Sequence, residues 1–430
     1  KSQLVCRPMK GTAPRGRTNA EDAAIRDFLR GDAKSRAENL MIVDLIRNDL
    51  SRIAEPGSVK VPALFEVESY PTLHQMTSTI TADSPDDLSP SGLLAALFPC
   101  GSVTGAPKVR AMEIIADIEH EPRGIYCGAI GHFSPAGCGG QSGSDGPRWS
   151  LNVPIRTIIL DHTGQGRMSI GSGVVADSDT NAEYDECLLK AEFARKPADS
   201  FSLIETLRLE PDGSYPKLER HLARLADSAR YFDFGYHEAD VREVLADQAA
   251  ALGNTEAETD STKRDSRGAA YRVRLLLGPR GSVSVTSTVL PTDSPPMGTQ
   301  TEAVVCLARQ RTRSADRFLA HKTTRRMAYD GTFARAFAAG YADALFFNEH
   351  DALTEGAIST VFIVEQGRWL TPPLDAGVLP GILRSELLEA GDRPIATETI
   401  SRKRLLDADE IYIGNSVRGL RRVTLDSVEI

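Results

Sequence analysis

The strongest constraint on the fold of this chain is a lysine and a glutamate that stand 33 residues apart in its second half. Lys322 lies in the run HKTTRR, residues 321–326, and Glu355 lies in the run LTEGAISTVF, residues 353–362. A Schiff-base enzyme needs a lysine that holds an aldehyde and, in many folds, a carboxylate that keeps a pyridine nitrogen protonated. This spacing supplies both groups and predicts a pyridoxal phosphate site. A lone Lys-Thr-Thr run is more often a solvated turn, and an acid ahead of a strand is common.

Two further segments of the second half support the cofactor prediction. They are LERHLARL, residues 218–225, and a segment that runs from LTPP at residue 370 to LPGILR, residues 379–384. The four segments together resemble the branched-chain aminotransferase class of pyridoxal phosphate enzymes, which also contains D-amino acid aminotransferase and aminodeoxychorismate lyase. The resemblance covers residues 200–430 and implies a class IV fold of two subdomains. It implies cofactor contacts from Lys322, Glu355, Arg224, Ser416 and the first backbone N–H groups of a helix at Ile382 and Leu383.

Length and composition set the remaining bounds. A chain of 430 residues favours two or three domains, and a net charge of −9 with a pI of 5.5 gives no reason to expect a nucleic-acid partner or an anionic membrane surface. The six cysteines contain no Cys-x-x-Cys pair, which argues against a zinc site and a disulfide framework. No apolar run reaches the roughly 18 residues of a membrane span, and no signal peptide opens the chain. We therefore expect a cytoplasmic protein without a membrane partner.

A change of pattern near residues 195–200 predicts the boundary between two domains, 1–196 and 200–430. Mixed α/β and α+β folds are expected for the two halves. Periodicity predicts helices over residues 35–53, 93–97, 109–118, 220–232 and 324–339, and strands over residues 129–133, 155–160, 271–277, 344–348 and 360–364. Residues 137–147 and 253–268 read as surface loops.

The first half contains five segments with a shared resemblance. They are RPMKGT (7–12), AENLMIVDLIRNDL (37–50), GSVTGAPK (101–108), IRT (155–157) and GSGVVADS (171–178). In this order they resemble the chorismate-binding enzymes, which include anthranilate synthase, isochorismate synthase and the large component of aminodeoxychorismate synthase. Gly105 and Lys108 are separated by Ala and Pro, whereas a Walker motif needs an adjacent Gly-Lys pair. Nucleotide binding is therefore rejected.

The substrate of such a family is a cyclic dicarboxylate that loses a ring hydroxyl, and Mg²⁺ is suited to chelate its ring carboxylate. The resemblance places Glu38, Glu183 and Glu186 around this metal, and the spacing of the last two puts them on one helix face. Arg156, in a predicted strand, is suited to clamp a carboxylate. We expect Thr104 and the backbone of Gly171, Ser172 and Gly173 to bind the other oxygens. Most glutamates on helices face water, which is the alternative reading.

Lys10 distinguishes members of this family. Anthranilate synthases typically carry a small residue at this position, whereas aminodeoxychorismate synthases of the lysine type carry Lys. A lysine can add to ring carbon 2 while the 4-hydroxyl leaves, after which ammonia enters at carbon 4 and expels it. A solvated or ion-paired Lys10 is the alternative.

The sequence also departs from the family pattern at two positions. Gln75 stands where the catalytic histidine of anthranilate synthases aligns, with His74 one residue early, so an acid role for His74 is in doubt. Ser35 stands where relatives often have a further acid.

The two halves together predict a route to 4-aminobenzoate for folate synthesis. Chorismate would be aminated to 4-amino-4-deoxychorismate, and the second half would release pyruvate from that product. A glutamine amidotransferase subunit is expected to supply ammonia, and the second half is expected to form a homodimer. Alternatives are an anthranilate or salicylate-type first half, a non-catalytic amidotransferase-docking first half, and a branched-chain or D-amino acid aminotransferase second half. Because the chorismate-binding fold normally extends upstream of the Lys10 segment, residues 1–430 by themselves are expected to convert little chorismate.

Overall fold

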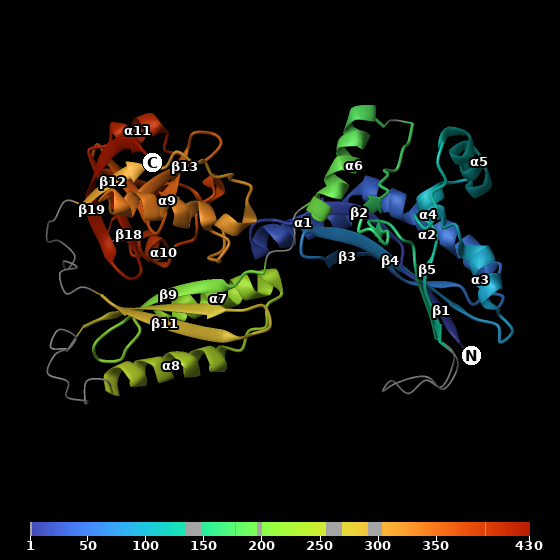
Figure 1. Cartoon of the computed structure of the whole chain (residues 1–430), viewed down its shortest axis with the longest axis horizontal. Helices are drawn as coiled ribbons and strands as arrows, with labels where there is room; N and C mark the ends of the chain where they lie inside the picture. Colours follow the sequence, from blue (N-terminus) through green and yellow to red (C-terminus); the bar gives the residue numbers. More distant parts are fainter. Residues whose placement is uncertain are drawn as a thin grey trace. The chain divides into compact units, whose positions relative to one another are not determined.

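Two compact units make up the chain in the computed structural model, which describes residues 2–134, 148–176, 178–195, 200–254, 269–290, 303–391 and 393–430. Unit 1 comprises Lys1–Arg15 and Ala23–Asp199, and unit 2 comprises Gly16–Asp22 and Ser200–Ile430. The predicted loop at 137–147, the interdomain segment 196–199 and nearly all of the predicted loop at 253–268 lie outside the described residues. Figure 1 shows the elements in the colours of the sequence.

Unit 1 is built on an antiparallel sheet with helices on it and two separate hairpins. Its strands are β1 (Gln3–Cys6), β2 (Met9–Pro14), β3 (Lys60–Ser69), β4 (Leu73–Asp83), β5 (Ile130–Ser134), β6 (Arg148–Asn152), β7 (Ile158–Leu160) and β8 (Gly166–Met168). Its helices are α1 (Asn19–Gly31), of which the first four residues belong to unit 2, α2 (Ala33–Ser51), α3 (Pro90–Leu97), α4 (Gly101–Thr104), α5 (Lys108–Ile118) and α6 (Thr180–Arg195). Strand β4 is central, with β3 on one side and both β1 and β2 on the other.

Helix α2 covers the sheet of unit 1 because its apolar residues recur at helical spacing. Ile42, Val43, Ile46 and Leu50 are buried against Ile80 of β4. In the same stripe the buried Asn39 side chain donates to the Lys10 carbonyl at 3.3 Å and accepts from the Ser78 hydroxyl at 2.6 Å. These bonds fix the backbone of β2 at Lys10.

Unit 2 contains two subdomains. The smaller has an antiparallel sheet in the order β11-β10-β9, formed by β9 (Leu203–Leu209), β10 (Tyr271–Leu277) and β11 (Val283–Val289). Helices α7 (Leu218–Phe232) and α8 (Glu238–Asn254) pack their apolar stripes on one face of this sheet (Figure 1). Because alternate residues of a strand share a face, Leu203, Leu207 and Leu209 of β9 enter this core, whereas Ile204 and Thr206 have the opposite orientation.

The larger subdomain holds an eight-stranded mixed sheet in the order β14-β13-β12-β19-β18-β15-β16-β17. These strands are β12 (Ala303–Leu307), β13 (Ala344–Phe347), β14 (Leu353–Gly356), β15 (Thr360–Glu365), β16 (Arg368–Thr371), β17 (Ile395–Thr397), β18 (Glu410–Asn415) and β19 (Gly419–Glu429). Its helices are η1 (Arg317–Leu319), α9 (Met327–Ala338), η2 (Leu374–Ala376), α10 (Ile382–Glu389) and α11 (Arg402–Leu406). Strand β13 and most of β15 are fully buried, as their nearly continuous apolar sequences require, and β14 is buried although it carries Thr354 and Glu355.

The short segment Gly16–Asp22 belongs to unit 2 although it stands near the start of the sequence. The Tyr231 hydroxyl donates to the Gly16 carbonyl, and the His321 ring lies 3.0 Å from the Arg17 carbonyl through its Nε2 atom. The Arg17 guanidinium donates to the Asp375 carbonyl at 3.2 Å. Unit 2 therefore includes residues 16–22 from the start of the sequence, and this segment is called the strap below.

Two predicted elements differ in the structure for identifiable reasons. Helix α9 begins at Met327 and not at residue 324, because Thr324 exchanges backbone and side-chain hydrogen bonds with Ser202. The strand predicted over 155–160 is present only as β7, from Ile158 to Leu160, because Arg156 has a left-handed φ of 51° that ends any extended run there. Within the described residues, no helix combines the length and the apolar character needed to cross a bilayer.

The core of the smaller subdomain generates a stability prediction. Leu207 is 1% exposed between α7, α8 and the sheet, so Leu207→Ala should lower the free energy of unfolding of unit 2 by about 2–5 kcal/mol. The measurement is urea unfolding followed by the fluorescence of Trp369 in a Trp149→Phe background, because Trp369 reports on unit 2. The matched control is Phe337→Ala at a 69% exposed site, for which a change within about 0.5 kcal/mol is expected. Equal losses in the two variants would contradict this core.

Candidate functional site

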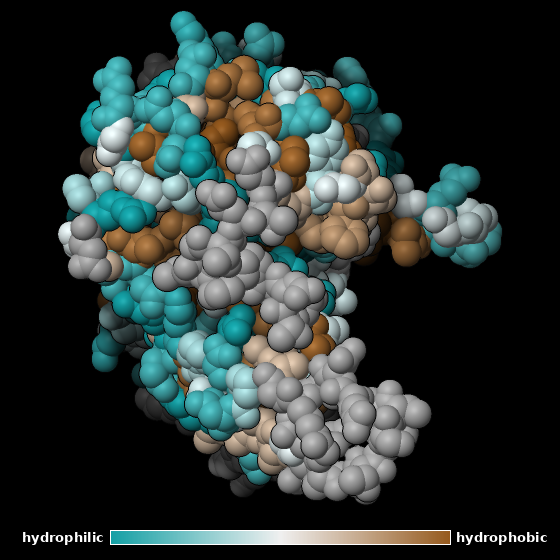
Figure 2. Space-filling model, turned by 90° about the vertical axis from the view of Figure 1, so that its left-hand side faces the viewer, coloured by the Kyte–Doolittle hydropathy of each residue, from teal (hydrophilic) through white to brown (hydrophobic). Residues whose placement is uncertain are grey.

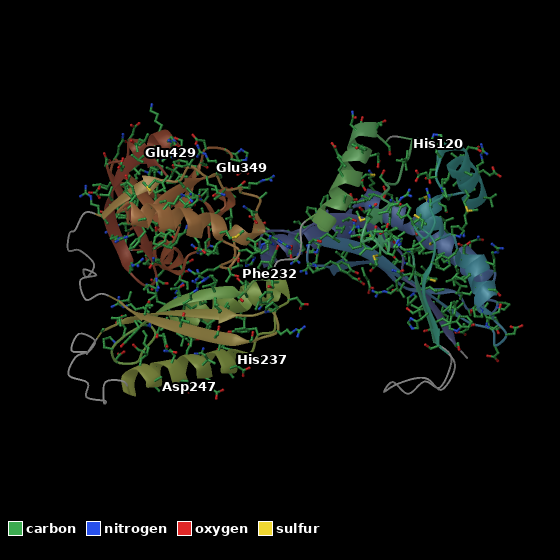
Figure 3. The ribbon with its side chains drawn as sticks, viewed as in Figure 1. His120, Phe232, His237, Asp247, Glu349 and Glu429 are labelled. Carbon is green, nitrogen blue, oxygen red and sulfur yellow. The ribbon has the colours of Figure 1, made fainter. Side chains whose placement is uncertain are left out.

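The segment that carries Lys322 is held like an extra strand beside β9. The Lys322 carbonyl accepts from the Ile204 N–H at 2.8 Å, and Thr323 forms a bridge with Leu203. Before it, the buried His321 ring stacks on Tyr231 at 4.4 Å and packs edge-on against Phe232 at 4.9 Å. Phe232, labelled in Figure 3, lies at the end of α7. The lysine is therefore presented by a backbone fixed on two sides.

Burial changes the ionisation of Lys322. Its removal from water, together with the Arg224 and Arg326 charges, lowers the Lys322 pKa to about 7, although Glu205 and Glu355 oppose this shift. Near neutral pH a large share of the molecules therefore holds an uncharged amine, the form that attacks an aldehyde. An ordinary solvated lysine is almost fully protonated at this pH.

Glu355 is the second buried group of this site. It is 9% exposed at the end of β14, accepts from the Tyr329 hydroxyl at 3.1 Å and accepts from the Leu379 N–H at 3.2 Å. Burial raises the Glu355 pKa to about 7 despite these hydrogen bonds and the nearby Arg326 and Lys322. The carboxyl group can therefore hold a proton or share one with a basic partner.

Arg224 and the start of α10 meet at the other end of the site. The Arg224 guanidinium donates to the Pro380 carbonyl at 3.2 Å, directly before the helix that begins at Ile382. The first N–H groups of a helix have no carbonyl partner within it, so Ile382 and Leu383 offer donors for an anion. Gly381 is required here, since a Cβ atom would lie 2.8 Å from the Thr360 hydroxyl. Ser416, in the turn between β18 and β19, donates to the Thr206 carbonyl at 3.4 Å.

Three residues of this site were not singled out from the sequence. Glu205 is 2% exposed on β9, and His221 is 1% exposed on α7. Tyr329 of α9 contacts Glu355. The signal for Glu205 was available, because strand alternation in LIETLRL places this acid on the same face as Leu203, Leu207 and Leu209, where it needs a buried partner.

Pyridoxal phosphate fits these residues. Two polar atoms of this region, Nε2 of His221 and Nε of Arg384, are buried without a hydrogen-bond partner in the described part of the chain. A largely uncharged lysine amine, a buried carboxyl group and a cation at a helix start are the donor set that an aldehyde, a pyridine and a phosphate require. Lys322, Glu355, Arg224, Ile382 and Leu383 would hold the cofactor.

In unit 1 the structure brings together five of the predicted residues. Lys10 Nζ lies 3.5 Å from a Glu38 carboxylate oxygen, and a Cβ atom on Gly173 would lie 3.1 Å from the same nitrogen. Glu183 accepts from the Ser178 hydroxyl at 2.7 Å, and its pKa is lowered by Ser172, by Ser178 and, to a smaller extent, by the charge of Lys10. Lys10 therefore lies among the acids and the glycine-rich segment that were expected to surround chorismate.

The expected metal ligands are not assembled as a set. Glu38 is paired with Lys10, and Glu186 is paired with Lys190 at 2.7 Å, while Lys190 also donates to the Gly171 carbonyl at 3.1 Å. Among the described residues, no group of three His, Cys, Asp or Glu side chains is arranged to hold a metal. Glu183 alone keeps a carboxylate oxygen that is shielded from solvent and without a partner. The arrangement thus offers one free ligand and two that lysines occupy.

The remaining sequence predictions for unit 1 have mixed outcomes. The expectation that Arg156 stands in a strand is wrong, because its positive φ places it in the loop before β7, where it is exposed. The Thr104 hydroxyl donates to the Cys100 carbonyl at 3.2 Å in the short helix α4. His74 is fully buried 2.9 Å from the Ser69 hydroxyl, whereas Gln75 contacts the Gly11 carbonyl next to Lys10. Ser35 lies against Gly11.

Sequence comparison agrees with the geometry of unit 2. The sequence model of the class IV amino-transferases, which are pyridoxal phosphate enzymes, matches residues 202–425. The chain therefore belongs to the class IV amino-transferase family. A solved 4-amino-4-deoxychorismate lyase from Pseudomonas aeruginosa is 26% identical and covers 53% of this chain and 83% of its own, with a TM-score of 0.43.

Residues 1–196 match the sequence model of the chorismate binding enzymes. Aminodeoxychorismate synthase component 1 of Escherichia coli is 50% identical over 185 residues, which are 43% of this chain and 38% of that protein. Aminodeoxychorismate synthase of Streptomyces griseus is 48% identical over 189 residues, which are 44% of this chain and 25% of that protein. The match therefore spans less than half the length of these relatives.

The lowered pKa of Lys322 predicts how pyridoxal phosphate capture depends on pH. The amine is protonated below its pKa of about 7 and uncharged above it, so the capture rate should rise between about pH 6 and 8 and then level off. The measurement is the rate of cofactor absorbance change in apo protein across this range, with borohydride fixation to locate the modified peptide. Lys322→Ala should abolish the fixation. A rate that still climbs steeply near pH 10, or fixation at another lysine, would contradict the assignment.

Proposed function

We propose that the protein makes 4-aminobenzoate from chorismate in two steps. Unit 1 would aminate chorismate at ring carbon 4, and unit 2 would convert the resulting 4-amino-4-deoxychorismate to 4-aminobenzoate and pyruvate. The observation that carries the proposal is the position of Lys10 between Glu38, Glu183 and Gly173. Relatives named aminodeoxychorismate synthase support it at 48–50% identity, whereas anthranilate synthase component 1 of Synechocystis is 40% identical over 195 residues.

The first step would use Lys10 as a nucleophile. Its ammonium must first lose a proton to solvent, and the release of Glu38, 3.5 Å away, from Lys10 to Mg²⁺ would favour this loss. The amine then forms a bond to ring carbon 2, the ring double bonds shift, and the 4-hydroxyl leaves as water after protonation. Ammonia forms the new bond at carbon 4, the double bonds shift back, and the lysine leaves from carbon 2. The amine is thereby placed para to the ring carboxylate.

We also propose that Glu183 is a ligand of Mg²⁺. Glu38 and Glu186 would complete the metal site after they separate from Lys10 and Lys190. The unpartnered Glu183 oxygen supports this proposal, and exposed lysine–glutamate pairs contribute little to stability. The ion would supply positive charge for the ring carboxylate. Lys10 and Lys190 need to lose only their glutamate partners for this metal site to form.

The second step would occur at the Lys322 site. When bound, pyridoxal phosphate supplies an electron sink for the carbon that carries the substrate amine. Lys322 is suited to remove the proton from that carbon, because its amine is partly uncharged near pH 7. Glu355 is suited to hold the pyridine nitrogen, and the loss of pyruvate leaves an aromatic ring. The substrate follows from the first half, since a synthase joined to a lyase in one chain delivers its product to the next enzyme.

Three further inferences complete the proposal. Ammonia would come from a glutamine amidotransferase subunit, as the name "component 1" of the Escherichia coli relative suggests. Unit 2 would form a homodimer. Figure 2 shows hydrophobic side chains on one side of this unit, and Val304 of β12 and Val428 of β19 are exposed, which supports association through unit 2. A cytoplasmic location is in keeping with five free cysteines in the described residues.

The full-length protein, supplied with chorismate, ammonia, Mg²⁺ and pyridoxal phosphate, should release 4-aminobenzoate and pyruvate in equal amounts. Lys10→Ala should remove the product from chorismate but leave its formation from added 4-amino-4-deoxychorismate intact. Lys322→Ala should do the reverse and let 4-amino-4-deoxychorismate accumulate. Identification is by mass and chromatographic retention.

Other products would assign other functions. An ortho product from chorismate would make unit 1 an anthranilate-type synthase. A keto acid formed from an amino acid, with no 4-aminobenzoate, would make unit 2 an aminotransferase.

The magnesium proposal has its own measurement. Mg²⁺ binding in the presence of chorismate, followed by calorimetry, should weaken by about tenfold or more in Glu183→Gln, because the free carboxylate oxygen is lost. Glu113→Gln on α5, paired only with Arg110 at the surface, is the matched control and should bind normally. Equal affinities for all three proteins would remove Glu183 from the site.

A further inference from the structure

We propose that Glu205 is a positioning residue for the cofactor phosphate, which it serves by fixing the orientation of the Arg224 guanidinium. The proposal rests on pyridoxal phosphate binding by unit 2 and extends it to a residue that does not itself touch the phosphate. Three observations carry it: the paired hydrogen bonds of the two side chains, the donors that this pairing leaves over, and the histidine that locks the carboxylate.

The first observation is a two-point contact between the two side chains. Arg224 Nε donates to one Glu205 carboxylate oxygen at 2.9 Å, and Nη2 donates to the other at 2.7 Å. Such paired bonds set the plane of the guanidinium as well as its position. Because Glu205 stands on β9 and Arg224 on α7, two packed elements determine that plane.

The second observation concerns the donors that remain. A guanidinium has five N–H groups, of which Glu205 takes two and the Pro380 carbonyl takes one, at 3.2 Å. One N–H group is left over on each of the two terminal nitrogens. The Pro380 contact brings the guanidinium to the start of α10, where the N–H groups of Ile382 and Leu383 are expected to bind an anion.

The third observation is that His221 holds the carboxylate in place. Its Nδ1 atom lies 2.6 Å from Glu205, in an environment from which water is excluded. Burial lowers the His221 pKa although Glu205 opposes this, so the ring is neutral and donates through Nδ1. Burial alone would raise the Glu205 pKa, but the Arg224 charge and the bonds from His221 and Arg224 outweigh it and lower that pKa to about 2. Glu205 is thus a permanent anion.

The arrangement also separates orientation from charge. An Arg224 that lacked its carboxylate would keep its positive charge and its attraction for phosphate, but its long side chain would regain rotational freedom. Removal of Glu205 should therefore weaken the recognition of the phosphate group and leave the rest of the cofactor unaffected. This selectivity distinguishes a positioning role from a purely structural one.

The experiment compares two probes on the apo protein. Dissociation constants are measured for pyridoxal phosphate and for pyridoxal, which lacks the phosphate. Glu205→Gln should weaken pyridoxal phosphate binding by about 10- to 100-fold and change pyridoxal binding less than about threefold. Glu389→Gln is the matched control. It breaks an exposed carboxylate–guanidinium pair with Arg220, which lies on α7 as Arg224 does. It should leave both constants unchanged.

A double-mutant cycle tests whether Glu205 acts through Arg224. Arg224→Lys retains the charge but loses the fork, so it should show the same selective loss for pyridoxal phosphate. The double variant should be little worse than either single variant. Additive losses would show that Glu205 acts independently of Arg224 and would overturn the proposal.

A shorter acid keeps the test decisive if Glu205→Gln does not fold. Glu205→Asp retains the buried anion but withdraws it from the fork, and a selective loss for pyridoxal phosphate is again expected. Parallel loss for both probes in folded variants would mean that Glu205 is only structural. Failure of the unmodified protein to bind pyridoxal phosphate would instead overturn the proposed function.

Discussion

The partial burial of Lys322 beside two arginines is the condition on which the site of unit 2 depends. A lysine in water is charged near neutral pH and cannot attack an aldehyde, whereas this amine has a pKa of about 7 because burial and two arginines disfavour its charge. The same burial would expel the Arg224 cation unless an anion accompanied it. Glu205 meets that requirement inside the smaller subdomain, and the aromatic cluster around His321 and Phe232 closes the lysine segment from the other side.

The sequence predicted most of unit 2 because its signals were of two independent kinds. Strands such as β10 and β15 follow from alternation and from apolar runs, whereas Lys322 and Glu355 were proposed from the chemistry of a Schiff-base enzyme and Arg224 from a family resemblance. The start of α9 could not be read from periodicity, since it depends on hydrogen bonds between Thr324 and Ser202, which stand 122 residues apart. His221 was missed for a similar reason. A histidine on an amphipathic helix has no special meaning until its partner across the core is known.

Unit 1 shows the limits of the same reasoning. Lys10, Glu38 and Gly173 come from three separated segments, and their proximity agrees with the expected order of motifs. Periodicity could also place Glu183 and Glu186 on one face of α6, but it could not foresee that Lys190, one turn later, pairs with Glu186. Arg156 was assigned to a strand because its neighbours are β-branched, whereas its left-handed backbone obeys local sterics that such a pattern does not contain.

The strap formed by Gly16–Asp22 has a consequence for how this protein can be divided. A cut at the join between Asp199 and Ser200 yields two pieces of sequence, but the second piece lacks the seven residues Gly16–Asp22, of which Gly16 and Arg17 offer their carbonyls to Tyr231 and His321. The fold of unit 2 is therefore not a contiguous stretch of the gene, and no single break in the chain separates the two units cleanly. An insertion or a recombination point near residue 16 would disturb His321, the neighbour of Lys322, which is 304 residues from Arg17 along the chain but one hydrogen bond away in space.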